Sequence, residues 1–261
     1  MDLHTIERWR RPTSRAQLAL GPGEAYVAGG TFLFSEPQRH LTGLVELAAL
    51  GWPDWEPLAG GGVRISATCS IAALQRVPWP LLGLARSAAD ALLMSWKVQS
   101  AATVGGNICL ALPAGAMTSL FAGLGATAWL WTPGGGERRL PVAAFVTGVG
   151  TSALLPGELV RGIEVPASAL GATYAFRRMS LTSDGRSAAV VVGRREAGRL
   201  VLTVTASTPS PVVLTLGETS PDQVVRAVRG ISSWHDDVHG APDWRAAMTE
   251  RLAIEVAEEL A

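Results

Sequence analysis

The amino-acid sequence predicts an α+β protein with two domains, and three observations carry this prediction. In the first two thirds of the chain, short apolar strand patterns alternate with short helical patterns. After Pro166 the pattern changes to consecutive strands, which two helices follow. Glycine supplies 29 of the 261 residues, above the usual share of about 7%, and its clusters mark turns or close backbone approaches. We therefore expect a first domain over residues 1–168, split near residue 55, and a second over 169–261.

In the first domain, the expected elements follow the spacing of the apolar residues. Strands are expected over 25–28, 44–47, 63–69, 127–131 and 159–165. Helices are expected over 70–75, 81–94 and 114–124, and Ser70 is a suitable N-cap for the first of them. The stretch 96–107 is expected to be extended, and the glycine-rich stretch 132–139 is expected to form an exposed turn.

The second domain is expected to hold an antiparallel sheet and two closing helices. Strands are expected over 173–179, 188–195, 200–206 and 211–216. Ala197-Gly198 is a typical two-residue hairpin between the second and third of these strands. The helices are expected over 221–229 and 242–260, and each begins with a proline in its first turn.

Charge and hydropathy exclude several classes of protein. Lys plus Arg and Asp plus Glu number 22 each, and such a neutral chain lacks the basic face that nucleic acid requires. No apolar run approaches the roughly 18 residues that a membrane span needs. The first twelve residues lack an apolar signal segment, so we expect a cytoplasmic location. Cys69 and Cys109 are too few for an iron–sulfur cluster or a structural zinc site, so no metal site is expected.

Two segments of the first domain share one pattern, in which an apolar run meets Gly-Gly and then a small polar residue. The pairs are Gly29-Gly30 before Thr31 and Gly105-Gly106 before Asn107. Glycine pairs can take positive φ and turn successive N–H groups toward one point, which makes an anion nest. A single Gly-Gly is more often only a tight turn. Two nests meeting in space, with Thr31, Thr103 and Asn107 as neutral donors, would suit a pyrophosphate without a lysine.

These segments resemble the two FAD-binding loops of the medium subunit of molybdenum hydroxylases, the xanthine dehydrogenase and carbon monoxide dehydrogenase flavoprotein family. Residues 28–33 match the first loop of that family, which reads approximately AGGxxL. Residues 102–108 match the second loop, approximately ATIGGNI, with Val104 in place of Ile. The likeness continues through 109–115, resumes at 162–166, and extends weakly over 174–178, 190–192 and 237–245. It therefore covers nearly the whole chain in the order of the family.

The resemblance implies an FAD-binding domain of the vanillyl-alcohol-oxidase (PCMH) type, followed by a smaller C-terminal domain like that of the carbon monoxide dehydrogenase flavoprotein. It assigns FAD contacts to Val27, Ala28, Gly29, Gly30, Thr31, Phe32, Leu33, Thr103, Val104, Gly105, Gly106, Asn107 and Arg177. No residue is assigned as an acid or a base, because the flavin supplies the redox chemistry.

The resemblance also implies partners: a molybdopterin-binding large subunit and a small subunit with [2Fe–2S] clusters. Electrons would pass from those clusters through FAD to NAD+, oxygen or a quinone. Three places depart from the family pattern: Ala116 replaces an Asp, Gln99-Ser100 replaces a common Arg-Asn, and Arg177 replaces a Lys. Two alternatives stay open: a free-standing FAD oxidoreductase acting on a small molecule, and a flavin-free scaffold subunit, which the three departures would allow.

Overall fold

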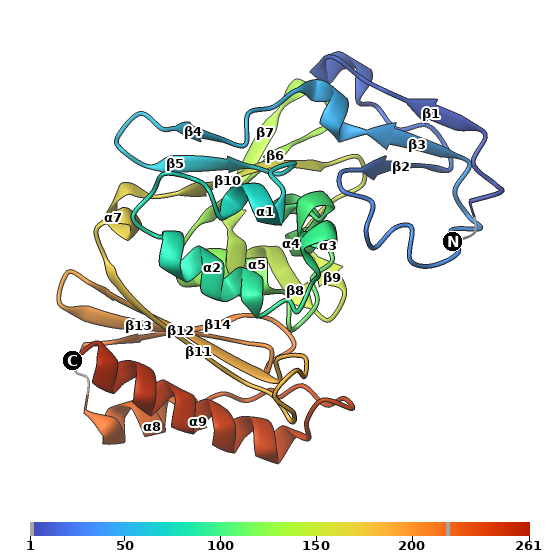
Figure 1. Ribbon diagram of the computed structural model, residues 1–261. Helices are drawn as coiled ribbons and strands as arrows, with labels where there is room; N and C mark the ends of the chain where they lie inside the picture. Colours follow the sequence, from blue (N-terminus) through green and yellow to red (C-terminus); the bar gives the residue numbers. More distant parts are fainter. Residues whose placement is uncertain (1–2, 218–219) are drawn as a thin grey trace.

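The computed structural model describes residues 3–217 and 220–261 (Figure 1). The chain begins with a three-stranded parallel sheet in the order β1–β3–β2. Its strands are β1 (Arg8–Arg10), β2 (Glu24–Val27) and β3 (Gly43–Glu46), with the 3-10 turns Arg15–Gln17 and Leu47–Leu50 beside them. A small apolar cluster, which contains Leu18 and Val45, joins this sheet to Leu159 in the next layer.

A five-stranded antiparallel sheet forms the centre of the first domain, in the order β4–β5–β10–β6–β7. Its strands are β4 (Trp55–Pro57), β5 (Val63–Ser66), β6 (Thr127–Trp131), β7 (Glu137–Pro141) and β10 (Leu159–Val165). One face of the sheet carries alternating apolar side chains such as Ile65, Leu130 and Ile163, all fully buried. These side chains pack against a group of short helices and form the main core.

The helices over this face are α1 (Ile71–Leu74), α2 (Leu82–Asp90), α3 (Trp96–Ala101), α4 (Val104–Cys109) and α5 (Ala116–Gly123). The prediction of an extended stretch over 96–107 is wrong, because α3 and α4 occupy it. Hydroxyl caps start both helices: the Ser95 oxygen accepts from the Val98 N–H and the Thr103 oxygen from the Gly106 N–H. The exposed turn predicted over 132–139 is shorter than expected, since β7 begins at Glu137.

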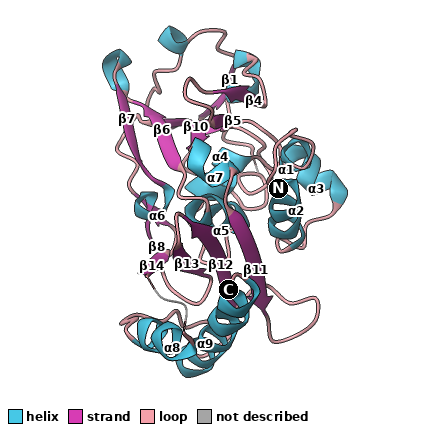
Figure 2. Ribbon diagram, turned by 90° about the vertical axis from the view of Figure 1, so that its left-hand side faces the viewer, coloured by secondary structure: helices cyan, strands magenta, loops and turns pink. Residues whose placement is uncertain are grey.

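The C-terminal part is a four-stranded antiparallel sheet covered by two helices. Its strands follow chain order: β11 (Thr173–Met179), β12 (Ala189–Glu196), β13 (Arg199–Thr205) and β14 (Val212–Leu216). Figures 1 and 2 show α8 (Pro221–Arg229) and α9 (Pro242–Glu259) together on one face of this sheet, with α5 toward the opposite face. The predicted hairpin is confirmed, because Ala197 and Gly198 both have positive φ, 50° and 75°.

Smaller elements complete the connections. They are the 3-10 turn Pro133–Gly135, α6 (Val142–Phe145), β8 (Val146–Gly148), β9 (Thr151–Ser152) and α7 (Ala167–Leu170). The predicted α+β class is confirmed, with antiparallel sheets and helices in separate layers. Among the described residues, no helix has both the length and the apolar character needed to cross a membrane.

Candidate FAD-binding site

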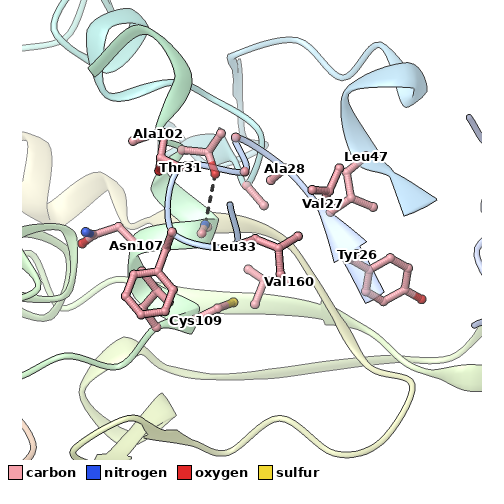
Figure 3. A pocket seen from close by; sticks show the side chains of 18 of the residues that line it. Tyr26, Val27, Ala28, Thr31, Leu33, Leu47, Ala102, Asn107, Cys109 and Val160 are labelled. Atoms are coloured by element: carbon pink, nitrogen blue, oxygen red, sulfur yellow. Dashed lines mark hydrogen bonds between the residues drawn. The ribbon is translucent and has the colours of Figure 1, made fainter. Parts of the chain in front are cut away.

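A cavity of about 450 Å³ lies where the loop after β2 approaches the α3–α4 connection and the chain before β10 (Figure 3). Its volume lies within the usual range for small-molecule sites, about 300–1,000 Å³. In Figure 3, Tyr26 and Leu47 lie toward one end, Asn107 lies toward the other, and Leu33 lies between them. The structure thus brings the two glycine segments, 76 residues apart in sequence, to the same cavity.

The first glycine segment has a backbone that only glycine fits well. Gly30 has a φ of +69°, and a Cβ there would lie 2.4 Å from the Phe34 ring. A Cβ on Gly29 would lie 1.9 Å from the carbonyl oxygen of Ala101, the last residue of α3. The two glycines therefore let this loop close tightly onto the end of α3.

The N–H groups of residues 29–33 are the most available donors at the cavity. All five residues line it. Within the described part of the chain, none of their N–H groups donates to another protein atom, although the Gly30 and Phe32 carbonyls accept from Phe34 and Ser35. A run of unpaired donors is expensive unless water or a ligand satisfies it. This segment therefore has the donor set of the anion nest predicted for it.

The second glycine segment is built differently from the nest that the sequence predicts. Gly105 and Gly106 lie inside α4 and do not have positive φ. Their N–H groups are already paired, that of Gly105 with the Ala67 carbonyl at 2.9 Å and that of Gly106 with the Thr103 hydroxyl at 3.1 Å. Gly105 is needed for packing, since a Cβ would lie 2.6 Å from that of Ala67. The second segment is therefore a close-packed wall with few free backbone donors.

Two side chains of this wall keep free donors. The Thr103 oxygen accepts from Gly106, which leaves its own O–H available to a ligand. The Asn107 Oδ1 accepts from the Met117 N–H at 3.1 Å and so fixes the amide, while its NH2 group has no protein partner among the described residues. Both residues line the cavity.

Four other positions singled out from the sequence lie outside the lining. Val104 is fully buried, and its N–H pairs with the Cys69 carbonyl. Arg177, on β11, forms ion pairs with Glu255 and Glu259 of α9. Ala116 begins α5 and is buried. Gln99 accepts from Gln75 and donates to the Met94 carbonyl, so it ties α3 to its neighbours.

The cavity is apolar and holds no basic side chain. Its one formally charged lining residue is Glu158, which is bound by Arg138 at 2.5 and 3.0 Å and by the Leu155 N–H at 2.8 Å. These contacts, led by the Arg138 hydrogen bonds, lower the pKa of Glu158. Burial raises the pKa of the Cys109 thiol to about 12, so this lining residue stays protonated and neutral.

Several lining residues carry no signal in the sequence. Tyr26 and Leu47 lie within predicted strands, and Leu154, Glu158, Leu159 and Val160 come from the chain before and within β10. Apart from Glu158, these are residues that occur throughout any core, so composition and spacing do not separate them from ordinary packing residues. A second cavity of about 680 Å³ beyond Tyr26 and Leu159 holds none of the predicted site residues.

Comparison with known families shows to which protein family this site belongs. Residues 7–168 match the family model of the FAD-binding domain in molybdopterin dehydrogenase. The chain belongs to this family. FAD is therefore its cofactor, and the match spans both glycine segments of this FAD-binding domain. A comparison of the sequence with curated proteins found no match.

Solved structures share the fold of this FAD-binding protein along nearly its whole length. The similar structures include carbon monoxide dehydrogenase chains from Oligotropha carboxidovorans, with a TM-score of 0.83 at 23% identity, and from Hydrogenophaga pseudoflava, with 0.84 at 22%. Each covers 98% of this chain and 97% of its own. Quinoline 2-oxidoreductase from Pseudomonas putida 86 has a TM-score of 0.80 at 19% identity, covering 97% of this chain and 96% of its own. At these identities the likeness shows the fold.

The cavity fits FAD on three counts. The dinucleotide carries a diphosphate, and unpaired backbone donors of the first segment line the wall. A loop with two glycines lets a ligand approach the backbone closely, because no Cβ stands there. Apolar walls on either side suit the two ring systems of the cofactor.

Proposed function

We propose that the chain is the FAD-binding electron-transfer subunit of a molybdopterin-dependent hydroxylase or dehydrogenase. Its partners would be a molybdopterin-binding large subunit and a small [2Fe–2S] subunit. Electrons would reach FAD from the clusters and leave to NAD+, oxygen or a quinone. Family membership over residues 7–168 and a fold shared with carbon monoxide dehydrogenase and quinoline 2-oxidoreductase chains support this proposal.

One observation carries the proposed placement of FAD: the unpaired N–H groups of residues 29–33 line a cavity without lysine or arginine. A diphosphate in such a place must be held by neutral donors, and a run of backbone N–H groups meets that requirement. The Thr103 hydroxyl and the Asn107 amide would add two donors from the opposite wall. The ring systems would then extend along the apolar walls, one of them toward Tyr26 and Leu47.

When bound, FAD supplies hydride and single-electron transfer. The chain's own residues would bind the cofactor, orient it and exclude water from its diphosphate. A direct role for Arg177 would require its ion pairs with Glu255 and Glu259 to open first. The proposal therefore gives the main binding role to residues 27–33, with Thr103, Gly105, Gly106 and Asn107 as the facing wall.

The test is FAD binding by the purified chain and by Gly30→Ala, measured by flavin absorbance and fluorescence quenching. We expect one FAD per wild-type chain. In Gly30→Ala the affinity should fall about tenfold or more, because an alanine at this φ is strained by about 1–2 kcal/mol and its Cβ meets Phe34.

Gly198→Ala is the matched control. Gly198 has a similar φ of +75° in the hairpin between β12 and β13, with no atom within 4 Å of an added Cβ. The backbone strain in Gly198→Ala is comparable to that in Gly30→Ala, yet the FAD affinity of Gly198→Ala should stay at the wild-type value. Equal affinity in Gly30→Ala and wild type would contradict the placement of FAD. A wild-type chain that takes up no FAD would favour the flavin-free scaffold.

A further inference from the structure

Edge strand β14 of the C-terminal sheet lacks the charges, prolines and bulges that often protect an edge. It reads Val212-Val213-Leu214-Thr215-Leu216, with no charge, no proline and no bulge in its pairing with β13. Within residues 3–217 and 220–261, no other backbone group bonds to its outer side. Open uncharged edges are templates for pairing with a further strand, and proteins usually block them.

The remaining edges of the described sheets are blocked or short. Edge strand β4 contains Glu56 and Pro57, and β7 contains three charged residues and Pro141. Strand β11 carries two positive charges, Arg177 and Arg178. Strands β1, β8 and β9 have three residues or fewer, and the four-residue β2 begins with Glu24. Among the edges of the described sheets, β14 is therefore the one that is open to pairing with a further strand.

We propose that β14 pairs antiparallel with β14 of a second copy of this chain. The strand is self-complementary: centred on Leu214, the pairing places Val212 opposite Leu216 and Val213 opposite Thr215. No like charges meet, since residues 211–217 are all uncharged. The chain's zero net charge also leaves little long-range repulsion between copies.

The pairing would join two apolar cores. Val212, Leu214 and Leu216 are only partly buried and already pack against the cluster beneath α8 and α9. Opposite copies of these side chains would cover one another and complete that burial. On the other face, Val213 is 45% exposed, and it would pack on Thr215 of the second copy. The two four-stranded sheets would become one continuous antiparallel sheet about a two-fold axis.

The expected association is weak, because five residue pairs span only about 17 Å and interfaces below about 1,200 Å² are typical of transient contacts. Sedimentation of the full FAD-loaded chain should therefore give a weight-average mass near 27.3 kDa at low concentration. The mass should rise toward twice that value as concentration increases. In the same range, hydrogen exchange of the β14 amides should slow.

Two double variants test the register. Val213→Lys with Thr215→Lys places lysines directly opposite one another, and like charges across a strand pair destabilise it, so the dissociation constant should rise at least tenfold. Val213→Glu with Thr215→Lys places opposite charges in the same positions, so it should dimerise as well as wild type or better. Both sites are exposed, so both variants should fold, as circular dichroism will show.

Thr173→Lys, an exposed threonine on the opposite edge strand β11, is the matched control and should dimerise like wild type. A wild-type mass that stays at one chain at every concentration overturns the proposal. So does a dimer that both double variants form equally well, because that dimer would use another surface. Slower exchange of β14 only in the presence of a molybdopterin subunit would overturn it in favour of a different partner strand.

Discussion

An ion pair between Arg10 and Glu24 joins the two outer strands of the first sheet. Arg10 on β1 donates to both carboxylate oxygens of Glu24 on β2, at 3.0 and 2.6 Å, across the intervening β3. The Gly21 N–H donates to the same carboxylate at 2.8 Å. These hydrogen bonds, led by those of Arg10, lower the pKa of Glu24 from its ordinary 4.5 to about 2.

This pair predicts an acid-dependent loss of stability. The folded pKa lies below the unfolded one, so the unfolded chain binds the proton first as pH falls. The contribution of Glu24 is therefore complete above about pH 4.5 and is lost as pH falls toward about 2. Glu24→Gln should show a shallower decline in the free energy of unfolding over that window, measured by urea titration at several pH values. Glu36→Gln, an exposed control, should keep the wild-type slope.

Residue patterns predicted that the two glycine segments meet in space, but not what each glycine does there. Gly-Gly marked both segments, and both line one cavity. Gly30 is required by its positive φ, whereas Gly105 is required by its contact with Ala67. The dipeptide Gly-Gly does not tell whether glycine is needed for a positive φ or for close packing, because that depends on which other segment of the chain packs against it. The expectation of two equivalent nests failed for that reason.

At the scale of elements, helix α5 packs against β12 and β13 of the C-terminal sheet, while α2 contacts β11. All eight of its residues are buried. The Ser119 hydroxyl lies 2.6 Å from that of Thr205 on β13, inside this contact. A Cβ on Gly123 would lie 2.5 Å from Val192 of β12, so the helix is packed as closely as a glycine allows.

Removing one hydroxyl of this pair should cost more than removing both. Ser119→Ala leaves the buried Thr205 hydroxyl without its partner, at a cost of about 1–3 kcal/mol. Ser119→Ala combined with Thr205→Val removes the orphaned group, so the two losses should not add. Urea unfolding of the four proteins in a double-mutant cycle measures the coupling. Ser87→Ala, on the surface of α2, should be nearly neutral, and additive losses at 119 and 205 would contradict the interpretation.

Long periodic elements could be predicted from the sequence, while short capped ones could not. The strands of the C-terminal sheet and helix α9 have enough apolar repeats to stand out. Helices α3 and α4 have six residues each. Both contain β-branched residues and α4 also contains two glycines, which suggest a strand or a loop. Their helical form depends on the Ser95 and Thr103 caps and, for α4, on the packing of Gly105 against Ala67. Only the tertiary structure supplies those neighbours.

At the scale of the whole molecule, the main core continues across the predicted domain boundary near residue 168. Val190, Val192 and Ala206 of the C-terminal part belong to the same cluster as Ile65 and Leu130 of the first part. The boundary remains a prediction about organisation along the chain. In terms of stability, the shared core couples the two parts.

The full chain should therefore unfold in a single transition. Because burial on each side depends on the other, hydrogen exchange in β12 and in β5 should report the same opening free energy at high denaturant. Far-UV circular dichroism and tryptophan fluorescence should give coincident curves, since Trp129 lies in the first part and Trp244 in the second. Two separate transitions, with β12 opening before β5, would show that the shared core does not couple them.

The donors of residues 29–33 also bear on how the site changes over evolutionary time. A lysine that binds phosphate is lost in one codon change, whereas a backbone N–H survives every substitution except one to proline. Thr31, Phe32 and Leu33 can therefore vary in side chain while the anion-binding surface persists, provided that Gly29 and Gly30 keep the loop closed. An anion-binding site made of main-chain N–H groups is therefore retained for as long as the fold is retained.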